Sequence, residues 1–175
     1  MLSLIEIFSP IQLLAWGAGL LYFVSYQKQS ANKTIMLWAP ADFLFALHFY
    51  FMNAPFFLFT AVAGSLRSII ALKCKRKTLG FYLLFYAVAL MGAFFFLEGG
   101  VKDFFGLIGS ILFCLSIWFK DNFITHRLYA FGHQMCWIVA YIFLQSYGGF
   151  FFMSLIFLSN LVGTGRYLVN QQNRS

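Results

Sequence analysis

The chain has 175 residues, of which 62% are hydrophobic and only 10% are charged. Because a soluble domain usually carries about 25% charged residues, this composition excludes a water-soluble fold and predicts that lipid surrounds most of the chain. The net charge of +7 does not indicate nucleic-acid binding, because the basic residues lie between apolar runs and form no stripe on one face. The three cysteines are too few and too scattered for a disulfide framework.

Seven apolar runs of roughly membrane-spanning length follow one another along the sequence. In chain order they are Ile11–Gln27, Thr34–Met52, Pro55–Leu72, Leu79–Leu97, Phe104–Phe119, Arg127–Gln145 and Gly149–Val169. The segments between them carry charges or turn residues, and His126 is expected in the loop before the sixth run. The connections after the second and sixth runs are so short that each predicts an antiparallel hairpin. The sequence therefore predicts an all-α polytopic membrane protein, residues 1–175 forming a single transmembrane domain.

The basic residues are sorted to one side of the predicted membrane. The loops after the first, third and fifth runs, together with the C-terminus, hold Lys28, Lys33, Lys73, Lys75, Arg76, Lys77, Lys120, Arg127 and Arg174. The opposite side holds only Lys102, beside Glu98 and Asp103. The positive-inside rule then places the N-terminus outside and the C-terminus in the cytoplasm. Trp38 and Trp118 lie near the basic side, where either an interfacial anchor or a buried packing role suits them.

The two halves of the chain share a pattern of runs, turns and charges. "LLAWGAGLLYF" resembles "KDFFGLIGSILF", and "AGSLRSIIAL" resembles "LSNLVGTGRYL". This predicts two three-helix repeats, 11–77 and 104–170, joined by an inversion helix at 79–97. Both repeats then cross the membrane in the same direction, a 3+1+3 arrangement known from transporters, with a space at the axis between them. A duplicated but solid scaffold is the alternative.

Arg67 lies inside the third apolar run, ahead of the basic cluster that ends it. A charge in the hydrocarbon region is costly, on the order of 3 kcal/mol on insertion scales. Asp42 lies at a similar depth in the second run, which is hairpin-linked to the third. We therefore expect Asp42 and Arg67 to pair or to share a polar cavity; snorkelling of Arg67 toward the cytoplasm is the alternative.

Further polar residues lie at comparable depths in the other runs. The candidate substrate-binding set, with Asp42 and Arg67, adds Ser65, His48, His133, Gln134 and Asn160. In this hypothesis amides and hydroxyls bind polar substrate atoms, Arg67 binds an anionic group, and His or Asp side chains bind protons. Each residue taken alone also fits an interhelical hydrogen bond that only holds the bundle together.

No catalytic motif is found in a credible context, so we expect no enzymatic activity and no cofactor. His126 and His133 are seven residues apart, about 10.5 Å along a helix, which is too far for shared ligation of one metal ion. We expect no metal site.

Two long stretches resemble the YgjV-type bacterial inner-membrane proteins, and the resemblance covers nearly the whole chain. The stretches are "HFYFMNAPFFLFTAVAGSLRSIIALK" and "CWIVAYIFLQSYGGFFFMSLIFLSNLVGTGRY". The features that carry it are the contexts of His48 and Arg67, the pair Cys136–Trp137, the turn Gly148–Gly149, and Asn160 followed by Arg166. This family is similar in architecture to PQ-loop proteins, SWEET-type sugar transporters, bacterial nicotinamide riboside transporters and the KDEL receptor. The resemblance implies a 3+1+3 arrangement.

In SWEET-type carriers, asparagines on the third and seventh spans hold the sugar. Asn160 matches this pattern, but the corresponding region of the third run holds Ser65 and Arg67. The proline–glutamine pair of PQ-loop proteins is absent. The resemblance therefore leaves a sugar and another polar or anionic metabolite open as substrates.

These observations favour an inner-membrane transporter or facilitator of a small polar or anionic metabolite, which works by alternating access around a central polar site. The alternative is a membrane receptor or assembly protein that binds a ligand or partner without moving it. The expected partners are the lipid bilayer and a small polar solute, with no nucleic acid, and a homo-oligomer is left open.

Overall fold

A computed structural model describes residues 9–28 and 30–172, and within these ranges the regular structure consists of seven helices. They are α2 (Pro10–Tyr26), α3 (Ala31–Phe51), α4 (Pro55–Lys73), α5 (Arg76–Phe96), α6 (Val101–Trp118), α7 (Phe123–Leu144) and α8 (Tyr147–Gln172). Each predicted run corresponds to one helix, so the all-α class and the seven-helix architecture are confirmed.

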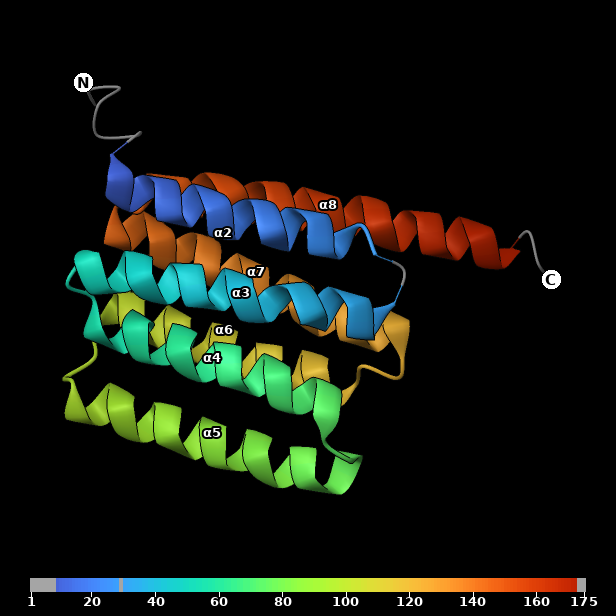
Figure 1. The fold of residues 1–175 in the computed structure, drawn as a ribbon, viewed down its shortest axis with the longest axis horizontal. Coiled ribbons are helices and arrows are strands. Elements are labelled where there is room, and N and C mark those ends of the chain that lie inside the picture. The colour runs from blue at the N-terminus through green and yellow to red at the C-terminus, as the bar shows by residue number, and fades with distance from the viewer. Residues whose placement is uncertain (1–8, 29, 173–175) are drawn as a thin grey trace.

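Five of these helices, α3, α4, α5, α6 and α8, are long and apolar enough to cross a membrane. The other two differ for separate reasons. Helix α2 has only 17 residues, and α7 carries the buried polar side chains His126, Arg127, His133 and Gln134, which lower its hydropathy. Both helices nevertheless lie alongside their neighbours within the bundle (Figure 1).

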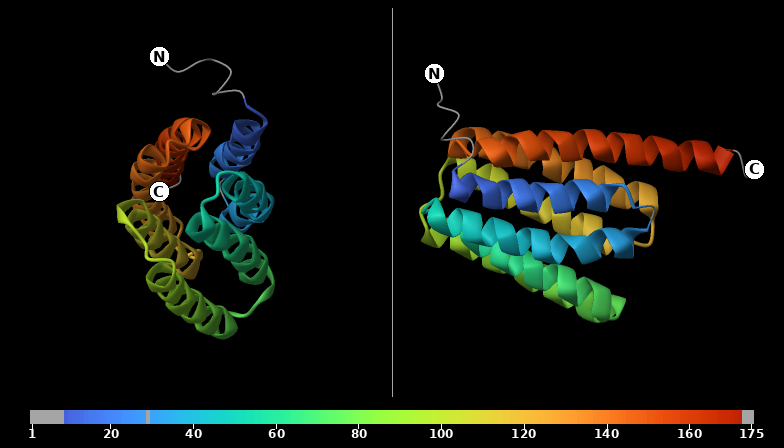
Figure 2. Two further views of the ribbon diagram at one scale, coloured as in Figure 1. Left: turned by 90° about the vertical axis from the view of Figure 1, so that its left-hand side faces the viewer. Right: turned by 45° about the horizontal axis from the view of Figure 1, so that its top comes forward.

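Six helices form a closed ring. Helix α3 packs between α2 and α4, α7 packs between α6 and α8, α2 contacts α8, and α4 contacts α6. We call α2–α4 the first triplet and α6–α8 the second triplet; the end-on view shows them as two facing walls (Figure 2). Helix α5 lies outside the ring against α4 and α6. This is the expected 3+1+3 arrangement, while the origin of 11–77 and 104–170 as copies of one repeat stays a prediction.

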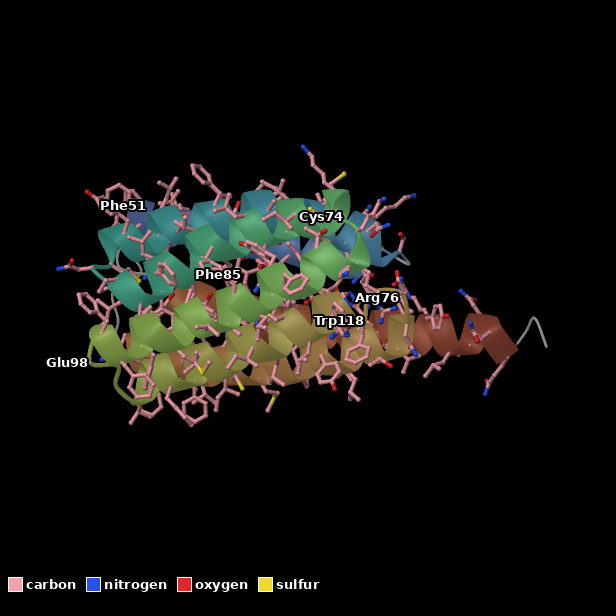
Figure 3. The ribbon with its side chains drawn as sticks, turned by 90° about the horizontal axis from the view of Figure 1, so that it is seen from below. Phe51, Cys74, Arg76, Phe85, Glu98 and Trp118 are labelled. Carbon is pink, nitrogen blue, oxygen red and sulfur yellow. The ribbon has the colours of Figure 1, made fainter. Side chains whose placement is uncertain are left out.

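The basic residues gather at one end of the bundle. Cys74, Arg76 and Trp118 lie at this end, and Phe51 and Glu98 lie at the opposite one (Figure 3). We call these the basic end and the far end. Since α2, α4, α6 and α8 all finish at the basic end, the two triplets run in the same direction.

Three helices finish at the far end with the same local structure. Asn53, Glu98 and Gln145 follow or end α3, α5 and α7 with positive φ values of 54°, 50° and 54°. In each case the next amide donates to a carbonyl five residues back, as Ser146 does to Tyr141. This is the Schellman arrangement, which satisfies carbonyls that a helix end leaves free.

Helix α7 begins earlier than the sequence suggested, at Phe123 and not at Arg127. The side chain of Asn122 accepts a hydrogen bond from the Thr125 amide at 3.1 Å and caps the helix. The prediction that His126 lies in a loop is therefore wrong. His126 lies in the first turn of α7, fully buried, with Nδ1 2.9 Å from the carbonyl oxygen of Ser116.

The two tryptophans near the basic end have different environments. Trp38 is completely buried, and its Nε1 donates to Ser25 Oγ at 3.0 Å, so the packing alternative is correct for it. Trp118 is partly exposed, and the guanidinium carbon of Arg76 lies 5.0 Å from its ring centroid. This position suits an interfacial residue.

Candidate functional site

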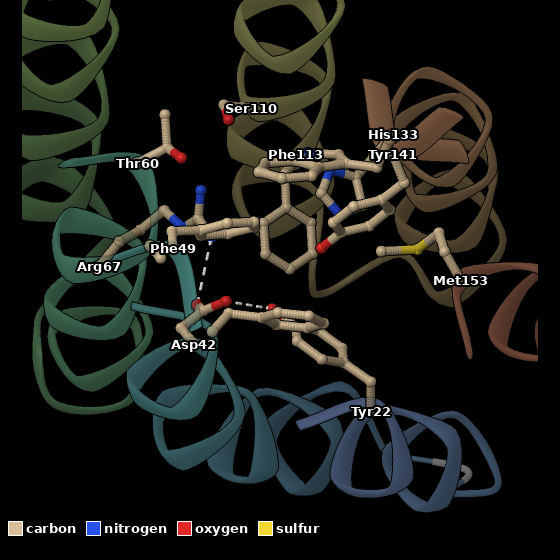
Figure 4. Close-up of a pocket in the computed structure, with 13 residues that line it drawn as sticks. Tyr22, Asp42, Phe49, Thr60, Arg67, Ser110, Phe113, His133, Tyr141 and Met153 are labelled. Atoms are coloured by element: carbon tan, nitrogen blue, oxygen red, sulfur yellow. Dashed lines mark hydrogen bonds and ion pairs between the residues drawn. The ribbon is translucent and has the colours of Figure 1, made fainter. Parts of the chain in front are cut away.

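A small cavity lies where the six ring helices converge. Its volume is about 30 Å³. All six helices contribute lining residues: Tyr22 from α2, Asp42 from α3, Arg67 from α4, Phe113 from α6, His133 from α7 and Met153 from α8 (Figure 4). Because one water needs about 10–15 Å³ by this measure, the cavity has room for about two waters and none for a metabolite.

The predicted pairing of Asp42 with Arg67 is confirmed. Arg67 Nη2 lies 3.8 Å from Asp42 Oδ2, and the two side chains are 3% and 11% exposed. Asp42 Oδ1 accepts a hydrogen bond from the hydroxyl of Tyr22 (Figure 4). The guanidinium points into the bundle, so the snorkelling alternative is wrong.

Aromatic rings hold the guanidinium in place. The guanidinium carbon of Arg67 lies 4.2 Å from the ring centroid of Phe113 and 5.1 Å from that of Tyr86. Nη1 also donates to the Tyr86 hydroxyl at 3.4 Å. A cation over an aromatic face is attracted by the ring quadrupole, and desolvation strengthens the attraction. Since Tyr86 belongs to α5, the helix outside the ring also contacts the site.

Gly64 leaves the space that the ion pair occupies. A Cβ atom at this position would lie 2.9 Å from Asp42 Oδ2 and 3.3 Å from Arg67 Nη2. Any larger residue would therefore displace the pair, so the packing of α3 on α4 depends on a glycine at this point.

Several polar groups at the cavity have no hydrogen-bond partner among the described residues. They are Arg67 Nε, Asp42 Oδ2 and Trp137 Nε1. Native structures leave only a few such groups, and each costs about 1–3 kcal/mol when it is fully buried. Side chains that line the cavity thus carry two donors without a hydrogen bond, and the acceptor Asp42 Oδ2 has only its ion pair with Arg67 Nη2.

His133 is oriented by the backbone of α6. Its Nδ1 lies 2.9 Å from the carbonyl oxygen of Gly109. Because a carbonyl only accepts, Nδ1 carries the proton, and Nε2 is the acceptor in the neutral ring. The imidazole stacks on Phe113 with 4.2 Å between ring centroids.

Asn160 and Gln134 lie in a separate polar cluster and do not line this cavity. Asn160 Nδ2 lies 3.3 Å from Gln134 Oε1, and Asn160 Oδ1 accepts from Arg127 Nη1 at 3.0 Å. The sequence indicated the depth of these residues. It did not indicate the rotation of α7 and α8 about their axes, which separates them from Arg67.

Sequence analysis did not identify Arg127 as a buried residue. Its Nη2 donates to the carbonyl oxygens of Tyr26 at 3.0 Å and Lys28 at 2.8 Å, at the C-terminal end of α2. Arg127 is only 1% exposed. Its position next to the basic loop made it look like a loop cation. Asn122, a typical helix-capping residue, is the sequence signal that could have placed Arg127 inside α7.

A second contact between the triplets lies at the far end. His48 Nδ1 lies 2.8 Å from the Ile11 carbonyl oxygen, and His48 Nε2 lies 3.0 Å from Ser146 Oγ. The amide of Gly148 donates to Gln12 Oε1 at 3.2 Å. His48 thus links the first triplet to the turn between α7 and α8 and does not line the cavity.

Ser65 has a local role. Its hydroxyl donates to the Ala39 carbonyl oxygen at 2.9 Å and joins α4 to α3. This is the interhelical hydrogen bond that the sequence analysis gave as the alternative.

As for metals, residues 9–28 and 30–172 contain no cluster of three or more His, Cys, Asp or Glu side chains that could hold an ion.

Comparison with known proteins identifies a family. The sequence model of the Imp-YgjV family, described as a bacterial inner membrane protein, matches residues 10–171. No curated protein and no solved structure matches the chain.

Proposed function

The chain belongs to the Imp-YgjV family of bacterial inner membrane proteins, and we propose that it carries a small polar or anionic metabolite across that membrane. The observation that carries this proposal is the buried Asp42–Arg67 pair in the cavity where both triplets meet. The solute is bound and moved without chemical conversion.

The energetic cost of the pair supports a functional role. Desolvating two charges costs several kcal/mol per ion, and well-packed apolar residues would often give a scaffold of equal or greater stability. Ionisable residues inside membrane helices mark substrate or ion pathways by default. A bundle that served only as a scaffold would gain little from this pair.

The free polar groups indicate which part of the solute each residue binds. We assign Arg67 Nε and Trp137 Nε1 to an oxygen acceptor or anionic group, since both donors are unpartnered. Asp42 Oδ2 accepts from a donor group of the solute or binds a proton, and His133 offers a further acceptor beside Phe113. In this proposal His48 acts through the contact that closes the far end, and Asn160, which also bonds Gln134, holds the Arg127 side chain that closes the basic end.

The positions of the contacts between the triplets support alternating access. The basic-end contact between the triplets is Arg127 with the carbonyl oxygens of Tyr26 and Lys28; the far-end contact is His48 with Ser146 and Gln12 with Gly148. A cavity of about 30 Å³ admits a metabolite only if one contact opens. Each neutral hydrogen bond of the far-end contact contributes about 0.5–1.5 kcal/mol net, and each bond from the charged Arg127 contributes about 1.5–3 kcal/mol. Binding energy of ordinary size is therefore enough to open one end.

The first experiment measures counterflow of a metabolite panel in proteoliposomes. We expect Arg67→Gln and Asp42→Asn to abolish uptake of the transported solute. The matched control is Arg166→Gln, because Arg166 is an exposed residue of α8 outside the cavity. Solute-dependent thermal stabilisation without flux would contradict transport and favour the receptor alternative.

A second variant tests whether the far end must open. A Cβ at Gly148 would lie 3.3 Å from the Cβ of Ala15, close to the 3.5–4.5 Å typical of disulfides. In a background with serine at Cys74, Cys114 and Cys136, we expect oxidised Ala15→Cys/Gly148→Cys protein to lose flux and to regain it on reduction. Undiminished flux in the cross-linked protein would contradict rocking of the triplets.

A further inference from the structure

An apolar groove runs between α5 and α6 on the outside of the bundle. Its volume is about 310 Å³, and its walls include Leu83 and Ala87 of α5 and Ile111 and Leu115 of α6, with Trp118 near the basic end. None of its lining side chains carries a charge. Its α5 wall extends from Gly80 to Ala87, about 10.5 Å at 1.5 Å per residue.

The groove faces the lipid. Helix α5 lies outside the ring and contacts only α4 and α6 extensively. On its outer face Phe81 and Phe85 are 68% and 71% exposed, and Leu84, which lines the groove, is 64% exposed. An apolar side chain on this surface is stable only against hydrocarbon. The walls of the groove match the chemistry of an acyl chain.

The basic end of the groove is strongly cationic. Lys75, Arg76 and Lys77 are exposed at the start of α5. The guanidinium of Arg76 lies over the Trp118 ring. The acidic neighbour of Arg76 is Asp121, whose Oδ2 lies 3.9 Å from Arg76 Nη1. Three cations against one carboxylate leave an excess positive charge where a lipid headgroup would lie.

We propose that this groove is a binding site for an anionic phospholipid of the bilayer. One acyl chain lies between Leu83 and Leu115, and the phosphate lies among Lys75, Arg76 and Lys77. Charge complementarity selects the headgroup, because each Lys or Arg near the surface attracts anionic lipid. The site is independent of the central cavity and of the proposed transport.

Native mass spectrometry of the purified chain tests the proposal. The protein is incubated with equal amounts of phosphatidylglycerol and phosphatidylcholine that carry identical acyl chains. We expect preferential retention of phosphatidylglycerol. Arg76→Gln and Lys77→Gln should each weaken its binding about fivefold, with Lys33→Gln as the control at the same end. Thermal unfolding verifies that every variant is folded.

A second pair of variants tests the acyl chain. Ala87→Trp fills the groove and should abolish retention, whereas Val88→Trp, on an adjacent residue that is 54% exposed and outside the groove, should not. Retention that survives Ala87→Trp would overturn the placement of the chain. Equal retention of the two lipids would overturn the headgroup assignment. A dimer that Ala87→Trp dissociates would show that a second copy of the chain occupies the groove, and would also overturn the proposal.

Discussion

Two buried arginines of this chain are satisfied in different ways. Arg67 has a carboxylate partner, Asp42, and aromatic faces around its guanidinium. Arg127 is bound by the carbonyl oxygens of Tyr26 and Lys28 and by the amide of Asn160. Carbonyls at a helix C-terminus carry partial negative charge, so they stabilise a cation without any acidic residue. Arg127 therefore makes a structural contact, whereas Arg67 is the residue to which the transport proposal assigns binding of a charged group.

Breaking the Asp42–Arg67 pair should destabilise the fold more than removing it. Arg67→Met leaves the Asp42 carboxylate buried without its counterion. Asp42→Asn likewise leaves the Arg67 guanidinium buried without its counterion. We expect each single variant to lose about 3–5 kcal/mol of unfolding free energy. The double variant should recover much of this loss, because neither charge is then left alone. Denaturation in detergent micelles measures all three.

Arg166→Met serves as the control for this comparison, because Arg166 is exposed on α8. It should change the unfolding free energy little. If the losses of the two single variants simply add in the double variant, the pair contributes no direct coupling, and the argument from Arg67 fails.

At the scale of the helices, α8 approaches α2 closely near the basic end. A Cβ at Gly163 would lie 2.8 Å from the carbonyl oxygen of Tyr26, the same oxygen that accepts from Arg127. A Cβ at Gly165 would have no neighbour within 4 Å. Gly163 and Gly165, two residues apart on α8, thus differ in how closely α2 approaches them.

This difference predicts opposite effects of the same substitution. Gly165→Ala should stabilise the protein by up to about 1 kcal/mol, because alanine favours the helix. Gly163→Ala should destabilise it, since the added methyl group separates α8 from α2 and weakens the Arg127 contact. Thermal unfolding compares the two variants directly. Equal stabilisation by both would contradict the close approach of α8 to α2.

At the scale of the whole bundle, the two ends differ in charge, as the sequence predicted. Lysines and arginines gather at the end where α2, α4, α6 and α8 finish, and Glu98 and Asp103 lie at the far end. The positive-inside rule then predicts that the basic end is cytoplasmic.

Labelling of cysteines in spheroplasts measures this orientation. In a chain with serine at Cys114 and Cys136, we expect a membrane-impermeant maleimide to label Lys102→Cys in intact spheroplasts. Native Cys74, at the basic end, should be labelled only after permeabilisation. The reverse pattern would place the N-terminus in the cytoplasm and would also invert the leaflet of the proposed lipid site.

The ring explains why the central site is closed from both sides. Each triplet supplies one wall, and polar contacts join the walls at both ends while the middle holds the ion pair. Transport in this architecture requires the walls to separate at one end at a time. The alternating-access proposal and the Ala15–Gly148 cross-link test both depend on this feature.

The pattern of apolar runs and charges along the sequence was sufficient to predict the seven helices and their order. It also predicted the shared direction of the triplets and the depth of Asp42 and Arg67 in the membrane. Run length and hydropathy report the cost of moving each segment into lipid, a property of the segment alone. The pairing of Asp42 with Arg67 followed as well, because a short hairpin leaves these two charges few other partners. The interfacial and buried alternatives for Trp38 and Trp118 stayed unresolved at that level.

Packing separated the polar residues that the sequence had grouped. Asp42, Arg67 and His133 line the cavity; Asn160 contacts both Arg127 and Gln134; His48 reaches Ser146; and Ser65 binds Ala39. A residue's depth follows from its place in the chain, but its direction depends on how each helix is rotated against its neighbours. That rotation is fixed by contacts between distant segments, such as Gly64 beside Asp42 and Gly163 beside Tyr26, which no local pattern contains.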